Sequence, residues 1–218
     1  MGLIINGNAP NKMLYNGIEV SLYFNGSKIW PETIDYNPLG LPDNTVRVIT
    51  NDGNPPKNDS PTDPASYTTA TLVSGTNDTY DVYKAGTDFT SLLSYSTNVI
   101  SILGANTSNI TNMNNMLYNC WNLTSIPLFD MRNVTSMSMF AYYCSKLENI
   151  PNFDVDKVTN MYCAFISCYR VKTGILRLYQ RASTQANPTS NHYGTFRQCG
   201  RDTTQGAAEL AQIPSDWK

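Results

Sequence analysis

The sequence predicts an α+β chain in which a solenoid of about 24-residue coils follows a small N-terminal β-hairpin module. The first observation is an internal repeat, because the segment that begins at Ile110 returns at Val134 and again at Val158. A fixed period of this length is typical of solenoids, whose single coils cannot bury their apolar side alone. The second observation is a set of three Asn-Gly pairs between short apolar runs in the first 31 residues, a pattern that favours tight hairpins.

Residues 1–31 are predicted to form a β-meander. Asn6-Gly7, Asn16-Gly17 and Asn25-Gly26 supply the turns, and residues 19–23 alternate as a strand does. So few strands bury little surface, and we expect this module to pack against the next unit or a partner chain and to serve attachment. The module resembles Asn-Gly hairpin modules of phage tail and fibre proteins.

Residues 32–85 are predicted to be a linker and a β cap. The prolines and glycine of residues 31–44 break any regular element. Residues 45–50, 69–73 and 79–84 then have the composition of strands. Together they are expected to cover the open N-terminal end of the solenoid, which must be covered to stay soluble.

Each coil is predicted to contain a short helical segment, a turn and a very short strand. Apolar or small residues spaced three and four apart fit one side of a helix or of linked 3₁₀ turns. Leu147 and Ile150 follow and a proline then stops regular pairing, so the strand is placed at Leu-x-x-Ile-Pro. In the second clear copy of the repeat, the helically spaced residues are Met137, Phe140, Ala141 and Cys144.

The solenoid is expected to span residues 86–218. A faint copy precedes Ile110, with Asn106 at the position that Asp130 and Asp154 take later, as an atypical capping repeat would have. The last coil is stretched by an inserted helix after residue 173, and Trp217 is expected to seal the end. Beyond the insertion, the positions of Met161, Phe165 and Cys168 are expected to be taken by His192, Phe196 and Cys199.

The repeat Val-Thr-x-Met…Phe…Cys…Leu-x-x-Ile-Pro…Phe-Asp resembles BspA-type leucine-rich repeats, which occur in bacterial surface proteins, mycoplasma lipoproteins and phage structural proteins. The resemblance covers about residues 86–218. It implies a right-handed leucine-rich-repeat solenoid and a recognition role, and it names no ligand.

Composition narrows the function classes. Charged residues are only 15% of the 218 residues and the formal net charge is −2, so the chain offers no electrostatic footprint for nucleic acid or an anionic membrane. No stretch approaches the length of a membrane span, and the residues after Met1 lack the pattern of a secretory signal. We therefore expect no nucleic-acid partner and no membrane insertion.

Cys120, Cys144 and Cys168 occupy the same place in successive coils and are predicted to form a ladder of small buried thiols. A disulfide framework is the alternative, but five cysteines are an odd number. The cysteines lack the spacing of a zinc site, and we expect no metal and no cofactor.

Few groups are suited to acid–base chemistry. Asp130 and Asp154 recur at the repeat period, either as a pair of carboxylates or as caps for backbone amides, and we expect caps. The single histidine, His192, falls on a methionine position of the repeat and is expected to be structural. The chain is therefore predicted not to be an enzyme.

A candidate binding surface follows from the residues between the inward positions. Aromatic side chains with polar tips favour interfaces and sugar stacking, although packing between coils is the alternative. The candidates on the helical side are Tyr118, Trp121, Tyr142 and Tyr143, and those on the strand side are Thr124, Ser125, Glu148, Asn149 and Asn152.

The sequence thus predicts a non-enzymatic virion structural or adhesion protein of a bacteriophage, such as a fibre, tail-tip or capsid-surface component. Its N-terminal module would join other virion proteins, a homo-oligomer is possible, and its repeats would bind a host surface glycan or protein, preferably a neutral one. The alternative is a bacterial cell-surface adhesin of the BspA-like type, located on the cell rather than on a virion assembled in the host cytoplasm.

Overall fold

The computed structural model describes residues 34–59, 67, 69–184 and 190–218, and the backbone of four short strands within the first 31 residues. The chain divides into two compact units, residues 1–35 and residues 36–218.

Two hairpins are described in the first unit. Strand β1 (Leu14–Tyr15) pairs antiparallel with β2 (Ile18–Glu19), and β3 (Leu22–Phe24) pairs antiparallel with β4 (Ser27–Trp30). Each hairpin leaves two residues between its strands, at the second and third predicted Asn-Gly pairs. The first pair, Asn6-Gly7, lies outside the described residues.

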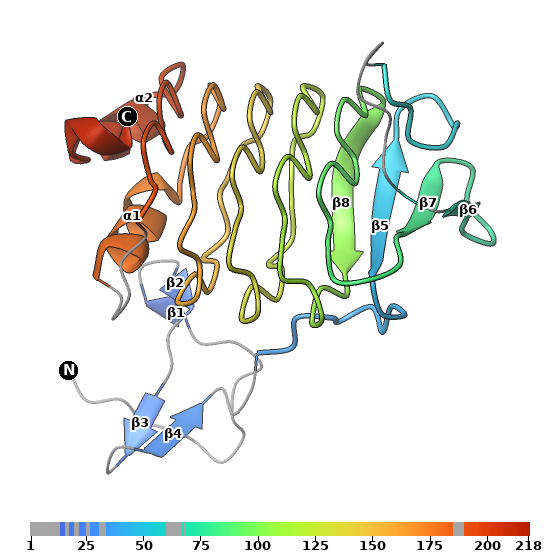
Figure 1. Cartoon of the computed structure of the whole chain (residues 1–218), viewed down its shortest axis with the longest axis horizontal. Coiled ribbons are helices and arrows are strands. Elements are labelled where there is room, and N and C mark those ends of the chain that lie inside the picture. Colours follow the sequence, from blue (N-terminus) through green and yellow to red (C-terminus); the bar gives the residue numbers. More distant parts are fainter. Residues whose placement is uncertain are drawn as a thin grey trace. The chain divides into compact units, whose positions relative to one another are not determined.

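The second unit begins with a four-stranded antiparallel sheet, which Figure 1 shows at one end. Alternation places Val46, Val48 and Val82 on its buried face, each fully removed from solvent. The strands in order β6-β7-β5-β8 are β6 (Thr69–Leu72), β7 (Thr79–Tyr83), β5 (Thr45–Thr50) and β8 (Val99–Ala105).

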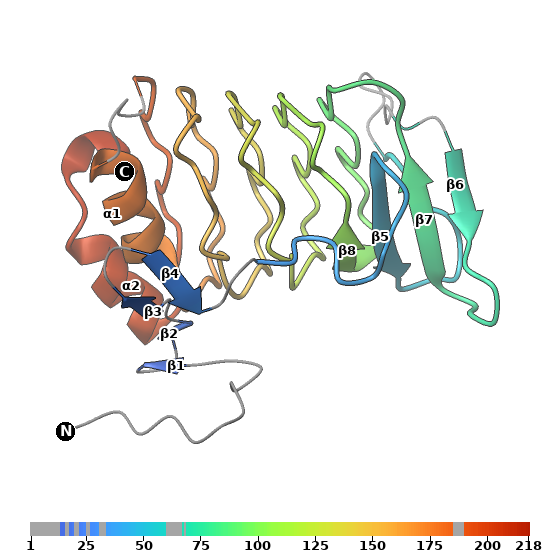
Figure 2. The ribbon, with the colours of Figure 1, turned by 90° about the horizontal axis from the view of Figure 1, so that it is seen from below.

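Beyond β8 the chain runs through stacked coils, which Figures 1 and 2 show side by side. Isolated parallel bridges join residues 24 apart along one edge, and the last step of that edge spans 31 residues because of the insertion. A second edge is marked by bridges from Ser101 to Ser125 and from Asn149 to Thr173. The bridges of the first edge join Asp88, Asn112, Ser136, Asn160 and Asn191 in succession.

Backbone hydrogen bonds alternate in direction within each coil. In the segment of linked turns, every second amide donates to a carbonyl of the next coil, and the amides between them donate to the carbonyl three residues back in their own coil. Elsewhere in the coil, amides such as those of Thr135 and Glu148 donate to the preceding coil. In the coil that begins at Val134, the bonds to the next coil run from Met139 N to Tyr162 O, Ala141 N to Ala164 O and Tyr143 N to Ile166 O, each 2.8 Å long.

Two residues in each coil have a left-handed backbone conformation, four positions apart. Their φ angles lie between 52° and 66°, and nine of the ten are not glycine. A left-handed residue cannot continue a right-handed helix, so the segment becomes two linked turns. The pairs are Ser91 and Tyr95, Asn115 and Asn119, Met139 and Tyr143, Cys163 and Ser167, and Gly194 and Gln198.

The predicted leucine-rich-repeat solenoid is therefore wrong. The regular elements of the described residues in the second unit are the antiparallel sheet, helices α1 (Ile175–Thr184) and α2 (Thr204–Ala211), and the short 3₁₀ helix η1 (Ser215–Trp217). The coils after β8 have neither the helical segment nor the regular strand that was expected, but turns and single bridges. The spacing of three and four arises from the linked turns, which sequence periodicity does not distinguish from a helix.

The core of the stack holds a column of thiols. Cys120, Cys144 and Cys168 are free and fully buried, as predicted. Each Sγ donates to a backbone carbonyl 27 residues earlier, at 3.0, 3.1 and 3.1 Å respectively. Burial raises the pKa of Cys120 from 9.0 to about 12, and it also raises the pKa values of Cys144 and Cys168.

Aromatic rings run beside the thiols and close the stack. Phe165 stacks on Phe196 with ring centroids 6.1 Å apart, and Phe196 stacks on Trp217 at the same separation. Trp217 is 5% exposed and also stacks on His192 at 4.3 Å. The bridge between Asn160 and Asn191 sets the last coil in the register that the sequence indicated for His192, Phe196 and Cys199.

The left-handed positions generate a test by paired substitution. Asn115→Ala should destabilise the protein by about 1 kcal/mol relative to Asn115→Gly, because glycine adopts φ of 54° without a steric penalty. Equilibrium denaturation in urea measures the difference. Ser138, which has no positive φ, is the matched site: there the glycine variant should be less stable than the alanine variant. The same order at both sites would contradict the explanation.

The buried thiols generate a prediction about alkaline pH. In the unfolded chain the Cys120 thiol ionises near its usual pKa of 9.0, whereas in the folded protein it stays protonated up to about pH 12. Its contribution to stability is therefore present in full below pH 9 and is lost as the pH rises from 9 toward 12. Denaturation midpoints should fall more steeply over this range in the native protein than in a Cys120→Ala variant. Parallel curves would show that the thiol is not held protonated.

Candidate binding surface

Two of the four predicted aromatic residues pack between coils. Tyr118 and Tyr142 are half-buried, and their rings stack with centroids 4.8 Å apart at an angle of 11°. Tyr95 adds a tilted ring at 5.3 Å from Tyr118. Because these rings cover one another's faces, the packing interpretation holds for Tyr118 and Tyr142.

The other two aromatic residues are exposed. Trp121 is 42% exposed and Tyr143 is 38% exposed, although both are large side chains. Tyr169, 48 residues after Trp121 and half-buried, contacts Tyr143 edge to face with centroids 5.8 Å apart. We call Trp121, Tyr143 and Tyr169 the aromatic edge, since they come from three successive coils and each stands directly before or after the buried cysteine of its coil.

A cation that the sequence did not predict contacts the aromatic edge. The Arg201 guanidinium lies over the Tyr169 ring, 4.1 Å from its centroid, in the range of a cation–π contact. The insertion in the last coil changes the step from 24 to 31 residues, so the simple period does not point to Arg201. Counting two residues beyond Cys168 and Cys199 would have found Arg170 and Arg201 as a pair.

Most of the polar candidates on the strand side, which we call the polar strip, contact residues 24 positions away in a neighbouring coil. Thr124 Oγ1 donates to Ile100 O at 2.8 Å, and Ser125 Oγ lies 2.8 Å from Ser101 Oγ. Its side chains are therefore committed to holding adjacent coils together.

Two of the remaining strand-side candidates, Glu148 and Asn149, also contact the next coil. Glu148 pairs with Lys172 at 2.8 Å, and this contact lowers the pKa of Glu148. Asn149 Oδ1 accepts from Thr173 Oγ1 at 2.7 Å. Asn152 is exposed, two residues past the inward-facing Ile150.

The recurring aspartates act as caps. Asp130 Oδ1 accepts from the Arg132 amide at 3.2 Å, and Asp154 Oδ1 accepts from the Asp156 amide at 3.3 Å. Asn106 accepts from the Ser108 amide in the same way. The Arg132 side chain also pairs with both Asp130 oxygens, and this contact lowers the pKa of Asp130.

An open hollow of about 430 Å³ lies beside these caps. Two of its lining residues, Asp154 and Asp156, form ion pairs with Arg181 at 2.8 and 3.2 Å, and these pairs neutralise their negative charges. The hollow is lined by Arg132, Asn133, Asp154, Asp156 and Lys157.

His192 has a structural position. Its Nε2 lies 3.0 Å from Asp216 Oδ2, and its ring stacks on Trp217. The contact with His192 lowers the pKa of Asp216. The histidine therefore helps to fix the closing segment of the stack.

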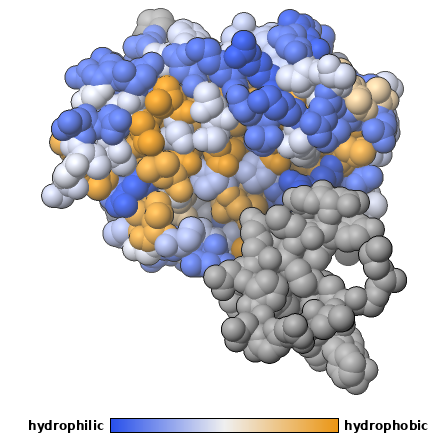
Figure 3. Space-filling view, turned by 180° about the vertical axis from the view of Figure 1, so that it is seen from behind, coloured by the Kyte–Doolittle hydropathy of each residue, from blue (hydrophilic) through white to orange (hydrophobic). Residues whose placement is uncertain are grey.

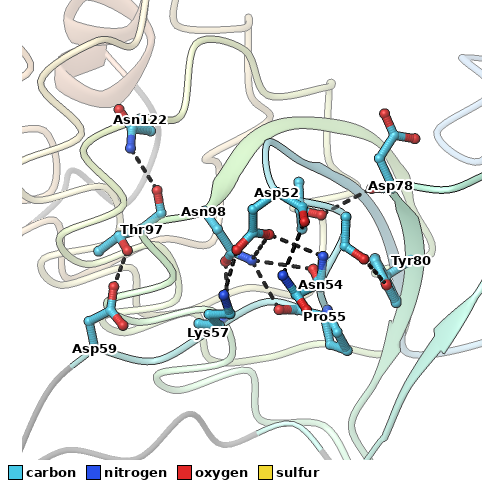
Figure 4. Close-up of polar contacts among 12 residues, drawn as sticks. Asp52, Asn54, Pro55, Lys57, Asp59, Asp78, Tyr80, Thr97, Asn98 and Asn122 are labelled. Carbon is cyan, nitrogen blue, oxygen red and sulfur yellow. Dashed lines mark hydrogen bonds and ion pairs between the residues drawn. The ribbon is translucent and has the colours of Figure 1, made fainter.

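At the opposite end, Asn98 holds the long loop that follows β5 (Figure 4). Its Nδ2 donates to Asp52 Oδ1 and to Pro55 O at 3.0 Å each, and its Oδ1 accepts from the Lys57 amide at 2.8 Å. The hydrogen bond from Asn98, followed by that from Lys57, lowers the pKa of Asp52. The loop is thus anchored to the first coil by a buried side chain.

Figure 3 shows one face of the molecule on which orange hydrophobic residues are interspersed with blue hydrophilic ones.

Within the described ranges, no group of three or more histidine, cysteine or acidic side chains is arranged to hold a metal ion. The helices described here are all too short or too polar to cross a bilayer.

Comparison with known proteins places the chain in a family. Residues 83–199, more than half of the chain, match the family described as "Mycoplasma protein of unknown function, DUF285", which is related to BspA-like repeat proteins. Neither the curated proteins nor the solved structures contain a significant match. The chain therefore belongs to the DUF285 family of mycoplasma proteins of unknown function.

Proposed function

We propose that this chain is a non-enzymatic recognition protein whose aromatic edge binds a glycan. The observation that supports this most is the exposure of Trp121 and Tyr143 on adjacent coils, with Tyr169 in contact with Tyr143. Single exposed apolar residues are common on protein surfaces, but aromatic rings gathered on one edge are typical of binding sites.

The geometry suits a sugar chain. Neighbouring coils are joined by backbone hydrogen bonds and lie about 4.8 Å apart, and the ring centroids of Tyr143 and Tyr169 are 5.8 Å apart. This spacing is close to the width of a sugar ring, whose apolar face stacks well on an aromatic ring. Aromatic side chains lose little conformational entropy on binding, so rings fixed by the coils would bind at low entropic cost.

The contacts of the acid–base residues support a role without catalysis. Asp130 and Asp154 accept backbone amides as caps, and His192 is held between Asp216 and Trp217. These side chains are committed to the architecture of the coils.

For the biological setting, we propose a virion component of a bacteriophage, such as a fibre, tail-tip or capsid-surface protein. The separate first unit of two hairpins would join other virion proteins, and the coils would face the host. A second candidate is a bacterial cell-surface adhesin of the BspA-like type. The family match favours this candidate, because the family is described from Mycoplasma.

Trp121→Ala tests the binding site. It should weaken attachment to cells or glycans by about tenfold, since an aromatic side chain that becomes buried on binding contributes on the order of 1–2 kcal/mol. The melting temperature should change little, because the ring is 42% exposed. Tyr83→Ala is the matched control, since Tyr83 is as exposed as Tyr143 but lies on β7. A large fall in melting temperature with intact binding per folded molecule would place Trp121 in the core instead.

Deletion of residues 1–35 tests the attachment role of the first unit. The remaining chain should keep the melting temperature of the second unit, because the two units are compact separately. It should fail to join the particle or cell surface that carries the full chain, as measured by immunogold labelling of purified particles and of cells. Normal incorporation of the truncated chain would refute the attachment role, and labelling of cells alone would select the bacterial setting.

A further inference from the structure

The small net charge conceals a strong asymmetry along the chain. Ten of the 15 basic residues follow residue 131, but only six of the 17 acidic residues do. The later coils therefore carry a net positive charge, although the chain as a whole has a formal charge of −2.

Part of this charge forms a row. Lys146, Arg170 and Arg201 stand two residues after the buried cysteines of three successive coils, where the preceding coil has Asn122. The Lys146 Nζ donates to Asn122 Oδ1 at 2.8 Å, so the side chain follows the direction of the stack. All three basic side chains are exposed. We call Lys146, Arg170 and Arg201 the cationic row.

The cationic row is only partly neutralised by the protein, although the charge of Arg170 contributes to lowering the pKa of Glu148. Within the described part of the chain, neither Lys146 nor Arg170 takes part in an ion pair, and Arg201 pairs only with the neighbouring Asp202 at 3.4 Å. Like charges in register on adjacent strands are unfavourable, and the spacing between coils is about 4.8 Å. A ligand with several negative charges would relieve this repulsion.

The cationic row adjoins the aromatic edge. Tyr169 directly precedes Arg170 in the chain, and Arg201 covers the Tyr169 ring at 4.1 Å. Trp121 stands one position before Asn122, at the start of the same row. The surface thus offers ring faces for stacking and, beside them, cations at the spacing of the coils.

We propose that the aromatic edge and the cationic row together bind an acidic polysaccharide, a chain of sugars that carry carboxylates. This inference rests on the proposed function and replaces the neutral partner expected from composition with an anionic one. The apolar faces of the sugars would stack on Trp121 and Tyr143, and their carboxylates would meet Lys146 and Arg170. Three cations flanked by Glu148 and Asp202 make a short site, whereas nucleic-acid surfaces have broader basic stripes.

The test compares one sugar chain in two charge states. Oligogalacturonate and its fully methyl-esterified form are titrated into the full chain, and binding is measured by calorimetry. The acidic form should bind at least about tenfold more tightly than the ester. Its affinity should fall as NaCl rises from about 50 mM to about 500 mM, because salt screens exposed charges.

Substitutions that copy the chain's own repeat locate the site. Lys146→Asn and Arg170→Asn each install asparagine, the residue that Asn122 places at this position of an earlier coil, and each should weaken binding of the acidic form about two- to fivefold. Lys157→Asn is the matched control, since the Lys157 Nζ also bonds an asparagine 24 residues earlier, Asn133 at 3.2 Å, but on another row. That variant should bind like the native protein.

Each other outcome overturns a defined part of the proposal. Equal binding of the acid and the ester would remove the acidic specificity but leave glycan recognition intact. Loss of binding in Lys157→Asn equal to that in Lys146→Asn would refute the location of the site. Competition by single-stranded DNA of the same charge at equal affinity would mean that the cationic row recognises negative charge alone and not the sugar. A protein that bound neither these chains nor a panel of neutral glycans would contradict the proposed function itself.

Discussion

The structure depends on the alternation of backbone hydrogen bonds within each coil. A right-handed helix directs all its amides along its own axis, and such a segment could not bond to a neighbouring coil. The two left-handed residues in each coil redirect every second amide toward the next coil, while the amides between them close the local turns. The backbone of each coil is thereby satisfied from two directions, as buried polar groups require.

This constraint accounts for the ladder of identical residues inside the stack. Coils that are bonded in register place equivalent side chains on top of one another, so an inward position must suit its copies above and below. Cysteine fits at 120, 144 and 168 because its small thiol fills the space and donates to a carbonyl of the coil before it. Phe165 and Phe196 follow the same rule, since they occupy equivalent positions of adjacent coils and their aromatic faces stack.

Outward positions are free from that requirement, and there the coils differ. The position of Trp121 is occupied by serine at 145 and by tyrosine at 169, although Cys120 and its two copies are unchanged. Variation outside and identity inside agree with the recognition role that we propose, because outward residues can change without disturbing the core. The same register also places charges in rows, so a few lysines and arginines produce a local field in a nearly neutral chain.

The sequence alone determined the period of the coils, the burial of the thiols and the capping by Asp130 and Asp154. These follow from local rules: a repeated spacing requires equivalent environments, and a short side chain after a turn caps the next amides. The sequence also suggested Trp121 and Tyr143, whose exposure agrees with their places between inward residues.

Only the tertiary structure decided that the coils consist of linked turns and that the regular elements are an antiparallel sheet and two short helices. Apolar spacing indicates which side chains face inward but not where the amides point, and it gives no sign that Met139 and Tyr143 adopt positive φ and donate their amides to the next coil. The tertiary structure likewise separated Tyr118 and Tyr142, which cover one another, from Trp121, and it brought Arg201 over Tyr169. Contacts between coils depend on the register in which the coils stack. The insertion in the last coil shifts this register by seven residues, and the sequence of a single coil does not specify it.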